Sequence, residues 1–427
     1  MLKRILTLAA GVVLGLALAV VAARVSLAWG LFPNRDLNRS SAYFKEVLQL
    51  VNENYVDTDA AAYDKLARSA IHGMVESLDP HSEFLESKDY TNLEEELSGD
   101  FSGIGVQVEM RKGRVVVIAP IAGSPSDKAG IERGDEIVRV DGKNLEKGLP
   151  MDAVIDRLRG KPGTKVAVGL YRPSTGRNLD FTLTRELIKQ ASVREARILP
   201  PHVGYIQLTE FSEHTGDEFI EALNRLLKTG IDSLIIDLRG NPGGLLDAAV
   251  EVADPFFKKN ELIVYTQGRK PEDRDEYRAG SNGEALELPI VVLINAGTAS
   301  AAEVVTGALK DTGRAVVVGE RSFGKGSVQS IFKLKNGEGM RLTTARYYTP
   351  GGVSIHEKGI TPHVEVVMSP DDDSKLRLQH LRSDVSDPKE FKERFGFAPI
   401  EDRQLNVALD VLKGLSVLDD EAAPPTH

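Results

Sequence analysis

The sequence of 427 residues contains no cysteine. This absence excludes disulfide bonds, thiolate metal sites, a cysteine nucleophile and a lipid anchor on an N-terminal cysteine. The sequence also lacks a basic excess, because 53 lysines and arginines stand against 63 acidic residues, for a net charge of −10. Such a chain has few spare cations with which to neutralise phosphates, so nucleic acid is not an expected partner.

Two common active-site motifs are missing as well. No H-E-x-x-H stretch, which would indicate a zinc protease, and no G-x-S-x-G nucleophile turn occurs. None of the eight histidines stands in a recognisable catalytic triad, and we interpret them as surface or capping residues. We therefore expect no metal and no other cofactor.

The N-terminus has the pattern of an export signal. Lys3 and Arg4 precede nineteen uncharged residues at 5–23, and Ser26-Leu-Ala28 resembles a cleavage site. The apolar run is also just long enough to span a bilayer. We expect export to the periplasm, with cleavage favoured over a retained inner-membrane anchor, and membrane contact only through an uncleaved N-terminus.

A chain of this length is expected to form two or three domains. Helical spacing of apolar residues at 40–55, after a serine cap, and at 63–78 predicts two helices with too little core of their own. We divide the chain into residues 1–28 (signal peptide or membrane anchor), 36–97 (N-terminal helical region), 98–186 (mostly β), 187–370 (α/β core), 371–418 (C-terminal helical region) and 419–427 (disordered tail).

The mostly β region resembles a PDZ domain. The resemblance rests on the stretch S-P-S-D-K-A-G-I-E-R-G-D-E-I-V-R-V-D-G-K-N-L at 124–145 and on the order of strands and helices around it. A PDZ domain binds a peptide by adding it as a strand to a sheet edge. The resemblance implies that the backbone amides of a loop hold the C-terminal carboxylate of a protein, and this loop is Gly103, Ile104, Gly105 and Val106.

The core region alternates strands and helices. Strands are predicted at 203–208, 233–237, 288–295 and 315–318, and helices at 218–227, 246–254 and 303–309. We expect a surface excursion at 267–285 and a hairpin that turns at Asn336-Gly337. In the C-terminal region one helix is evident, at 404–413, and the acidic tail is predicted to be disordered.

A candidate nucleophile and a candidate base follow two of these strands. Ser300 stands where the strand at 288–295 turns into a helix N-terminus, and Lys325 lies just beyond the strand at 315–318. A lysine acts as a base once its pKa falls from about 10.4 to about 7–8, which burial without a carboxylate partner achieves. The residues that flank Lys325 are uncharged, and Gly324 and Gly326 allow a close backbone approach.

Three further residues complete the predicted site. Gln329 lies four positions after Lys325, on the same face of an extended segment, where its amide would accept a hydrogen bond from the amine. The backbone amides of Ala301 and Gly243 are the predicted oxyanion donors. Glu303 is interpreted as a first-turn helix acid, and Arg239 is left open between orienting the site and a structural ion pair.

Four motifs in this order resemble those of the C-terminal processing peptidases, or tail-specific proteases. They are L-R-G-N-P-G-G (238–244), G-T-A-S-A-A-E (297–303), F-G-K-G-S-V-Q (323–329) and Y-T-P-G-G (348–352). The resemblance implies a ClpP/crotonase-like α/β serine protease core with a PDZ domain in front, and a catalytic set of Ser300, Lys325 and Gln329. It also implies protein substrates recognised by their C-terminal tails, a lipoprotein adaptor and substrates among cell-wall hydrolases.

Three other interpretations are weaker. Residues 319–325 nearly match a phosphate-binding P-loop, but Gly326 replaces the required serine or threonine and a strand follows. Ser322 and Lys325 form an S-x-x-K pair, without the K-T-G motif that accompanies it in penicillin-binding proteins. A non-catalytic PDZ scaffold of the cell envelope is the alternative outside enzymes. We predict an exported serine endopeptidase that forms a homo-oligomer through its terminal helices.

Overall fold

The computed structural model describes residues 34–422 with gaps at 112, 147–148, 281–283 and 383–384, together with the isolated positions 11, 15 and 20. The predicted signal peptide or anchor at 1–28 therefore lies almost entirely outside the described residues. Among the residues that are described, no helix has both the length and the apolar character needed to cross a bilayer. The chain forms two compact units, Met1–Phe84 and Leu85–His427.

The first unit contains the two predicted helices, α2 (Arg35–Asn54) and α3 (Tyr63–Glu76). The prediction that a serine caps the first helix at position 40 is wrong. Asn34 caps it instead, because its side-chain oxygen accepts hydrogen bonds from the amides of Asp36 and Leu37 at 3.1 and 3.2 Å. No side chain of α2 is buried. Its apolar residues Tyr43, Phe44 and Val47 are 69%, 44% and 40% exposed.

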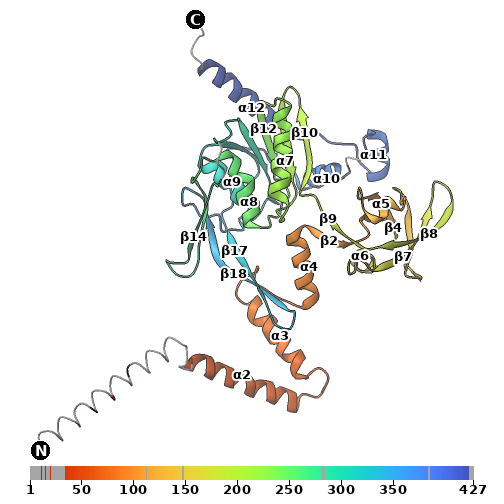
Figure 1. The fold of residues 1–427 in the computed structure, drawn as a ribbon, viewed down its shortest axis with the longest axis vertical. Coiled ribbons are helices and arrows are strands. Elements are labelled where there is room, and N and C mark those ends of the chain that lie inside the picture. The colour runs from red at the N-terminus through yellow and green to blue at the C-terminus, as the bar shows by residue number, and fades with distance from the viewer. Residues whose placement is uncertain are drawn as a thin grey trace, which may run out of the picture. The chain divides into compact units, whose positions relative to one another are not determined.

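The predicted PDZ domain is a β-sheet with two flanking helices (Figure 1). A two-stranded stem of β2 (Asp100–Gly103) and β9 (Glu186–Lys189) leads into it and out of it. Its apolar core includes Val117, Val154 and Leu170. Its elements are β3 (Val106–Arg111), β4 (Arg114–Pro120), α5 (Pro125–Lys128), β5 (Glu136–Val140), β6 (Lys143–Asn144), α6 (Met151–Leu158), β7 (Lys165–Arg172) and β8 (Arg177–Thr184).

The α/β core is built on a six-stranded sheet in which all neighbours are parallel except the first pair. The carboxyl ends of its parallel strands share one edge, the usual place for a site in such a sheet. In sheet order the strands are β10 (Val193–Leu199), β11 (Val203–Leu208), β12 (Ser233–Asp237), β15 (Ile290–Ile294), β16 (Ala315–Gly319) and β19 (Val364–Glu365).

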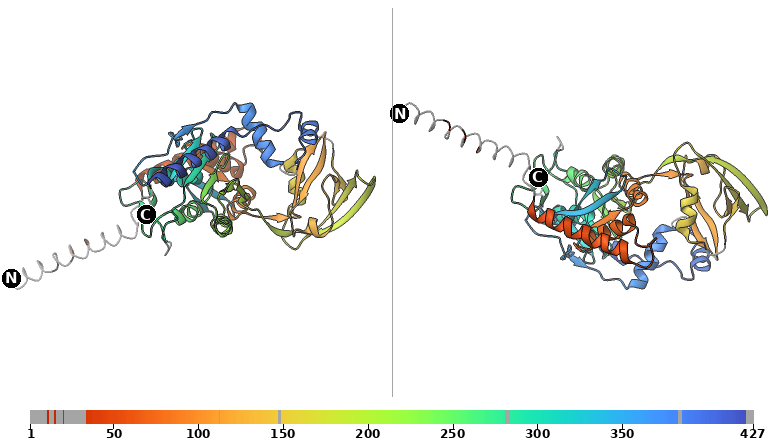
Figure 2. Two further views of the ribbon diagram at one scale, coloured as in Figure 1. Left: turned by 90° about the horizontal axis from the view of Figure 1, so that it is seen from above. Right: turned by 90° about the horizontal axis from the view of Figure 1, so that it is seen from below.

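Helices cover both faces of this sheet (Figures 1 and 2). On one face, α7 (Thr215–Lys228), α8 (Leu246–Ala253) and α9 (Ala301–Asp311) bury their apolar sides. On the other face, Ala408 and Leu412 of α12 (Arg403–Ala422) pack against Ile235 and Val291. Apolar residues on both sides explain why β12 and β15 are continuous apolar runs rather than alternating ones.

A second sheet carries the residues that follow the lysine. The predicted hairpin is present. Its loop is longer than two residues, since the amide of Leu334 donates to the carbonyl of Glu338 at 2.8 Å across the loop. The predicted surface excursion at 267–285 contains a strand. The strands of this sheet are β1 (Glu83–Leu85), β13 (Leu262–Gln267), β14 (Arg274–Arg278), β17 (Ser327–Lys333) and β18 (Gly339–Tyr348). The remaining short elements are α4 (Ser87–Ser98) and η1 (Asp254–Phe256).

The C-terminal region is more helical than predicted. Two helices precede α12, namely α10 (Pro370–Leu381) and α11 (Pro388–Phe395). Each begins with a proline behind a capping side chain, Ser369 or Asp387. The helix α12 also continues to Ala422, four residues into the tail predicted to be disordered, because extending an existing helix requires no new nucleation.

Candidate active site

Ser300 has a strained backbone at the start of α9. It follows β15 and is the N-cap of the helix, with a φ of 52° and a ψ of −118°. A positive φ is rare for a residue with a Cβ and is found where neighbouring structure enforces it, often at functional sites. The side chain is 6% exposed. The sequence-based placement of Ser300 at a strand-to-helix turn is confirmed.

Hydrogen bonds join the serine turn to the turn that follows β12. The hydroxyl of Thr298 donates to the carbonyl of Leu238 at 2.8 Å, and the amide of Ala299 donates to the carbonyl of Asn241 at 2.9 Å. The side-chain oxygen of Asn295 accepts from the amides of Gly240 and Gly297. Two motifs that lie far apart in the sequence therefore form one rigid unit.

Glu303 connects the nucleophile turn to the lysine loop. Its Oε2 accepts the amide of Ser300 at 2.9 Å and the amide of Lys325 at 2.8 Å. Its Oε1 accepts the hydroxyl of Ser322 at 2.5 Å and the amide of Gly324 at 2.7 Å. Burial raises the pKa of Glu303, and the four hydrogen bonds oppose that rise. One carboxylate oxygen thus holds the backbones of both predicted catalytic residues next to each other.

The lysine loop packs closely against the segment at 355–359. A Cβ on Gly326 would lie 2.2 Å from the amide nitrogen of His356, and one on Gly324, where φ is 93°, would lie 3.0 Å from the amide nitrogen of Gly359. The amide of Tyr347 also donates to the carbonyl of Gly326 at 2.9 Å. The prediction that both glycines serve a close backbone approach is confirmed.

Gln329 lies on β17, but its relation to the lysine differs from the simple expectation. A β-bulge falls between Val328 and Gln329 and interrupts the alternation of faces on which the prediction rested. The side-chain nitrogen of Gln329 donates to the hydroxyls of Ser327 and Thr343 at 2.9 and 3.2 Å. The predicted role of Gln329 requires its side-chain carbonyl oxygen to accept a hydrogen bond from the amine of Lys325. This role stays a prediction.

The predicted oxyanion donors flank Ser300. A Cβ on Gly243, whose φ is 97°, would lie 2.7 Å from the Cβ of Ser300 and 2.9 Å from the amide nitrogen of Ala301. Only a glycine allows this contact. The amide of Gly243 donates to the side-chain oxygen of Asn241 at 2.8 Å, so in this arrangement it is engaged within its own turn.

Comparison with known proteins agrees with this geometry. Residues 202–366 match the model of peptidase family S41, and residues 102–183 match that of the PDZ domain. The carboxy-terminal-processing protease of Bartonella bacilliformis is 36% identical over 431 residues, which cover 97% of this chain and 96% of that protein. The chain belongs to peptidase family S41.

Two further proteins are similar over a smaller part of the chain. The carboxy-terminal processing protease CtpA of Bacillus subtilis is 38% identical over 321 residues, which cover 74% of this chain and 66% of that protein. Among solved structures, the photosystem II D1 C-terminal processing protease is 33% identical, with 76% of this chain and 92% of that chain aligned and a TM-score of 0.43. The serine turn and the lysine loop both lie within the S41 match.

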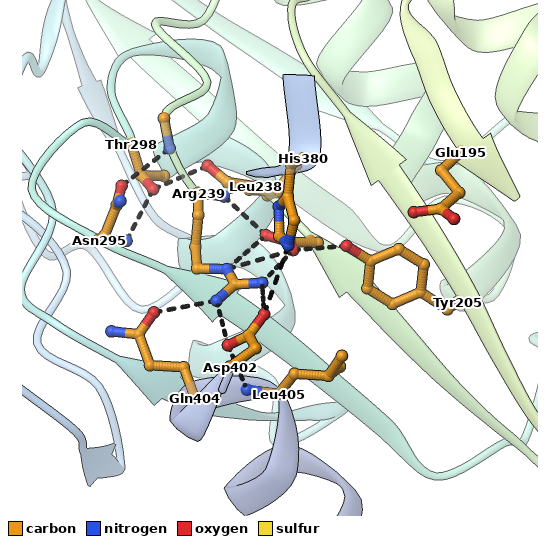
Figure 3. A network of polar contacts seen from close by, with 12 residues as sticks. Glu195, Tyr205, Leu238, Arg239, Asn295, Thr298, His380, Asp402, Gln404 and Leu405 are labelled. Atoms are coloured by element: carbon orange, nitrogen blue, oxygen red, sulfur yellow. Dashed lines mark hydrogen bonds and ion pairs between the residues drawn. The ribbon is translucent and has the colours of Figure 1, made fainter. Parts of the chain in front are cut away.

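A second buried carboxylate of the S41 core, that of Asp237, is paired with Arg239, which Figure 3 shows beside Asp402. Asp237, at the end of β12, accepts the hydroxyl of Tyr205 at 2.7 Å and the guanidinium of Arg239 at 2.6 Å. Arg239 also donates to both oxygens of Asp402, each at 2.8 Å. His380 of α10 lies 3.7 Å from Asp402.

The cation of Arg239 stabilises the charged forms of both Asp237 and Asp402. Burial alone would raise the pKa of Asp237, but Arg239 beside it holds that pKa below the usual value. Arg239 was left open between orienting the site and a structural ion pair, and the structure shows that it makes such a pair. Through Asp402 it joins the start of the L-R-G-N-P-G-G turn to the residues just before α12. Sequence reasoning missed Asp402 and His380, because no local motif marks them.

The predicted peptide-binding loop of the PDZ domain is shaped by its own carbonyls. The carbonyl of Ile104 accepts from the hydroxyl of Ser126 at 2.6 Å, and that of Gly105 accepts from the hydroxyl of Ser124 at 2.9 Å. Gly105 has a φ of 70°, and a Cβ there would lie 2.2 Å from that of Ser124. The four loop residues from Gly103 to Val106 line a groove of about 500 Å³.

The geometry also excludes the two rival motifs. Ser322 lies in a loop rather than a helix, and its hydroxyl is bonded to Glu303 at 2.5 Å and to the amide of Ile360 at 2.6 Å, so it serves the fold. Lys325 is followed by β17, whereas a P-loop lysine needs a helix whose N-terminus holds phosphate.

Proposed function

We propose that the chain is an exported serine endopeptidase that recognises the C-terminal tails of proteins through its PDZ domain. Ser300 is the nucleophile, Lys325 the general base and Gln329 the residue that orients the amine. The observation that carries this proposal is the shared hydrogen bonding of the Ser300 and Lys325 amides to one oxygen of Glu303.

The proposed reaction needs an uncharged amine. Lys325 takes the proton of the Ser300 hydroxyl as the oxygen attacks the peptide carbonyl, and the resulting ammonium then protonates the leaving amine. Water hydrolyses the acyl-enzyme with the same amine as base. Because only the free amine accepts a proton, we expect activity to rise toward alkaline pH.

The oxyanion of the tetrahedral intermediate is assigned to the amides of Ala301 and Gly243. The amide of Gly243 is bonded to Asn241 at 2.8 Å, so it must leave that oxygen, or be shared with it, when the intermediate forms. Positioning of two amides against a developing charge is usually a large term in acyl transfer.

A cleavage assay with matched controls tests the catalytic assignment. The substrate is a synthetic peptide of about twenty residues with an apolar C-terminal tail, supplied with a free carboxylate or as the amide. Ser300→Ala, Lys325→Ala and Lys325→His should lose cleavage and remain folded by circular dichroism. The matched variants Ser330→Ala and Lys335→Ala, at residues on or beside the β17–β18 hairpin, should cleave like wild type.

Two results would contradict the proposal. Turnover by folded Ser300→Ala would mean that another residue is the nucleophile. Tight binding of the free-carboxylate peptide without cleavage by the wild-type chain, alone or with an adaptor, would favour the PDZ scaffold.

The cellular setting is proposed from the N-terminal pattern and the resemblance. Export through the basic and apolar residues at 1–28 would place the enzyme in the periplasm, where a lipoprotein adaptor delivers substrates such as cell-wall hydrolases. Fractionation of cells with an antibody against the chain tests this. Recovery in the cytosol would exclude periplasmic function.

We also propose that the chain forms a homo-oligomer through α2. The residues Tyr43, Phe44 and Val47 recur at helical spacing and are at least 40% exposed, which is more apolar surface than an isolated helix usually leaves in water. Val47→Asp should therefore reduce the mass measured by light scattering after gel filtration. Glu53→Ala, an exposed control on the same helix, should not.

A further inference from the structure

The groove of the PDZ domain is not lined by the PDZ domain alone. Its floor is β3, which is at the edge of its sheet and pairs with β4 on one side. One wall is α6, through Ile155 and Leu158. A further wall comes from α10 in the C-terminal region, through Leu378, Leu381 and Arg382.

An ion pair fixes α10 at this groove. Arg382 is 3% exposed, and its Nη1 lies 3.0 Å from the Oε2 of Glu109 on β3. Its guanidinium also lies over the ring of Phe395, 5.1 Å from the centroid. Glu109 also pairs with Arg111, whose Nη2 lies 2.5 Å from its Oε1, so one carboxylate is shared by two guanidinium groups at this end of the groove.

The neighbouring residue of α10 is exposed instead. Leu381 is 51% exposed although it is a large apolar side chain that lines the groove. Leu378 lines the same wall one helical turn earlier and is only partly buried. The combination of a buried anchor, one partly buried leucine and one exposed leucine is typical of a surface that contacts a ligand.

The position of α10 along the groove defines which part of a tail it meets. A tail that adds to β3 with its carboxylate at the loop 103–106 runs toward Glu109 as it extends upstream. Glu109 is three residues beyond Val106, roughly 10 Å along the strand. The wall formed by α10 therefore faces the side chain three or four positions before the carboxylate.

We propose that α10 builds a specificity subsite for that upstream residue, and that Leu378 and Leu381 select an apolar side chain there. This inference rests on the proposed recognition of C-terminal tails and adds a second determinant to it. The carboxylate is read by the PDZ loop, and the upstream residue is read by a helix from outside the PDZ domain.

Binding rather than cleavage tests the subsite. Fluorescence anisotropy is measured on the full chain carrying Ser300→Ala, with labelled ten-residue peptides that have leucine or aspartate at the fourth position from the end. A C-terminally amidated leucine peptide reports carboxylate recognition. Burial of a leucine side chain predicts a preference for leucine over aspartate of roughly tenfold.

Adding Leu381→Asp should bring that ratio to about one while the free-carboxylate peptide still binds better than its amide. The matched control Val367→Asp changes another exposed apolar residue, 69% exposed and outside the groove, and should keep the wild-type ratio. Leu378→Ser provides a second, less disruptive change in the same wall and should lower the ratio in part.

The outcomes separate this inference from the proposed function. An unchanged ratio in Leu381→Asp, or tighter binding of every peptide because α10 merely obstructs the groove, would overturn the subsite and leave tail recognition standing. Failure of all peptides to bind, with no difference between acid and amide, would overturn both.

Discussion

The S41 core buries two carboxylates completely and treats them in opposite ways. Asp237 and Glu303 are both 0% exposed. Asp237 is paired with the guanidinium of Arg239, whereas Glu303 accepts four hydrogen bonds from neutral donors, namely three backbone amides and the hydroxyl of Ser322. The pKa of Asp237 is lowered and that of Glu303 is raised.

The difference reflects what each carboxylate holds. The Asp237 pair joins a strand end to the C-terminal region through Asp402, where a strong fixed charge network suits a structural role. Glu303 holds the backbones of Ser300 and Lys325. A cation beside this carboxylate would favour its ionised form. Uncharged donors align the two residues without supplying a counter-ion to either.

The largest expected effect follows from breaking the charged network. Arg239→Met leaves Asp237 buried with only Tyr205 as a side-chain partner, which should lower the free energy of unfolding by about 3–5 kcal/mol. Urea denaturation measures this. Arg278→Met, which removes a solvent-exposed pair with Glu276, should change stability far less, because water and salt screen such a pair. A similar small loss in Arg239→Met would mean that the network is dispensable.

Glu303→Gln should break the alignment instead. A glutamine keeps one acceptor oxygen and turns an NH₂ group toward two donors, so either the amides of Ser300 and Lys325 or the donors of Ser322 and Gly324 lose their acceptor. We expect kcat to fall roughly 100-fold, about 2.7 kcal/mol, with KM little changed. Glu338→Gln, at a buried carboxylate in the β17–β18 loop, is the matched control and should retain activity.

If Glu303→Gln lost stability but kept kcat, Glu303 would be a helix cap and nothing more. That was the sequence-based interpretation of this residue as a first-turn acid. Glu303 accepts the amide of Ser300 at 2.9 Å, so its interpretation as a first-turn helix acid is confirmed. What the sequence could not reveal is that the same carboxylate reaches Gly324 and Lys325, because those contacts depend on how two strands end side by side.

The pH dependence of stability should separate the two carboxylates as well. The pKa of Asp237 is lower in the folded protein, so its contribution is present above about pH 4 and is lost as the pH falls. The pKa of Glu303 is raised by burial, so its ionisation removes stability as the pH rises above about 4.3. Urea unfolding between pH 4 and 7 should show this loss in wild type and not in Glu303→Gln.

The parts that sequence reasoning predicted correctly are those with local signals. Apolar runs identify β12 and β15, and glycines on both sides of Lys325 indicate a close approach that the structure contains. The missed helices α10 and α11 had a local signal too, a capping residue followed by proline, but few apolar residues at helical spacing.

Other features have no local signal. The bulge before Gln329 depends on its pairing with β18, and the bond between Arg239 and Asp402 joins residues 163 positions apart. No pattern in one sequence encodes such a pairing. The engagement of the Gly243 amide by Asn241 is likewise a property of the folded turn.

The smallest expected effect follows from removing the hydroxyl of Tyr347, one of two tyrosines that lie beside Asp237 or Ser300. Tyr205 donates to Asp237. Burial raises the pKa of Tyr347 to about 12, and the neighbouring side chain of Ser300 opposes that rise. We therefore expect Tyr347 to stay protonated at working pH and to donate a hydrogen bond to Ser300 without titrating. Tyr347→Phe should lower kcat a few-fold, in line with one neutral hydrogen bond, and leave the pH profile unchanged. Tyr348→Phe, one position further on β18, should match wild type, and an equal loss in both variants would assign the effect to the strand rather than to the hydroxyl.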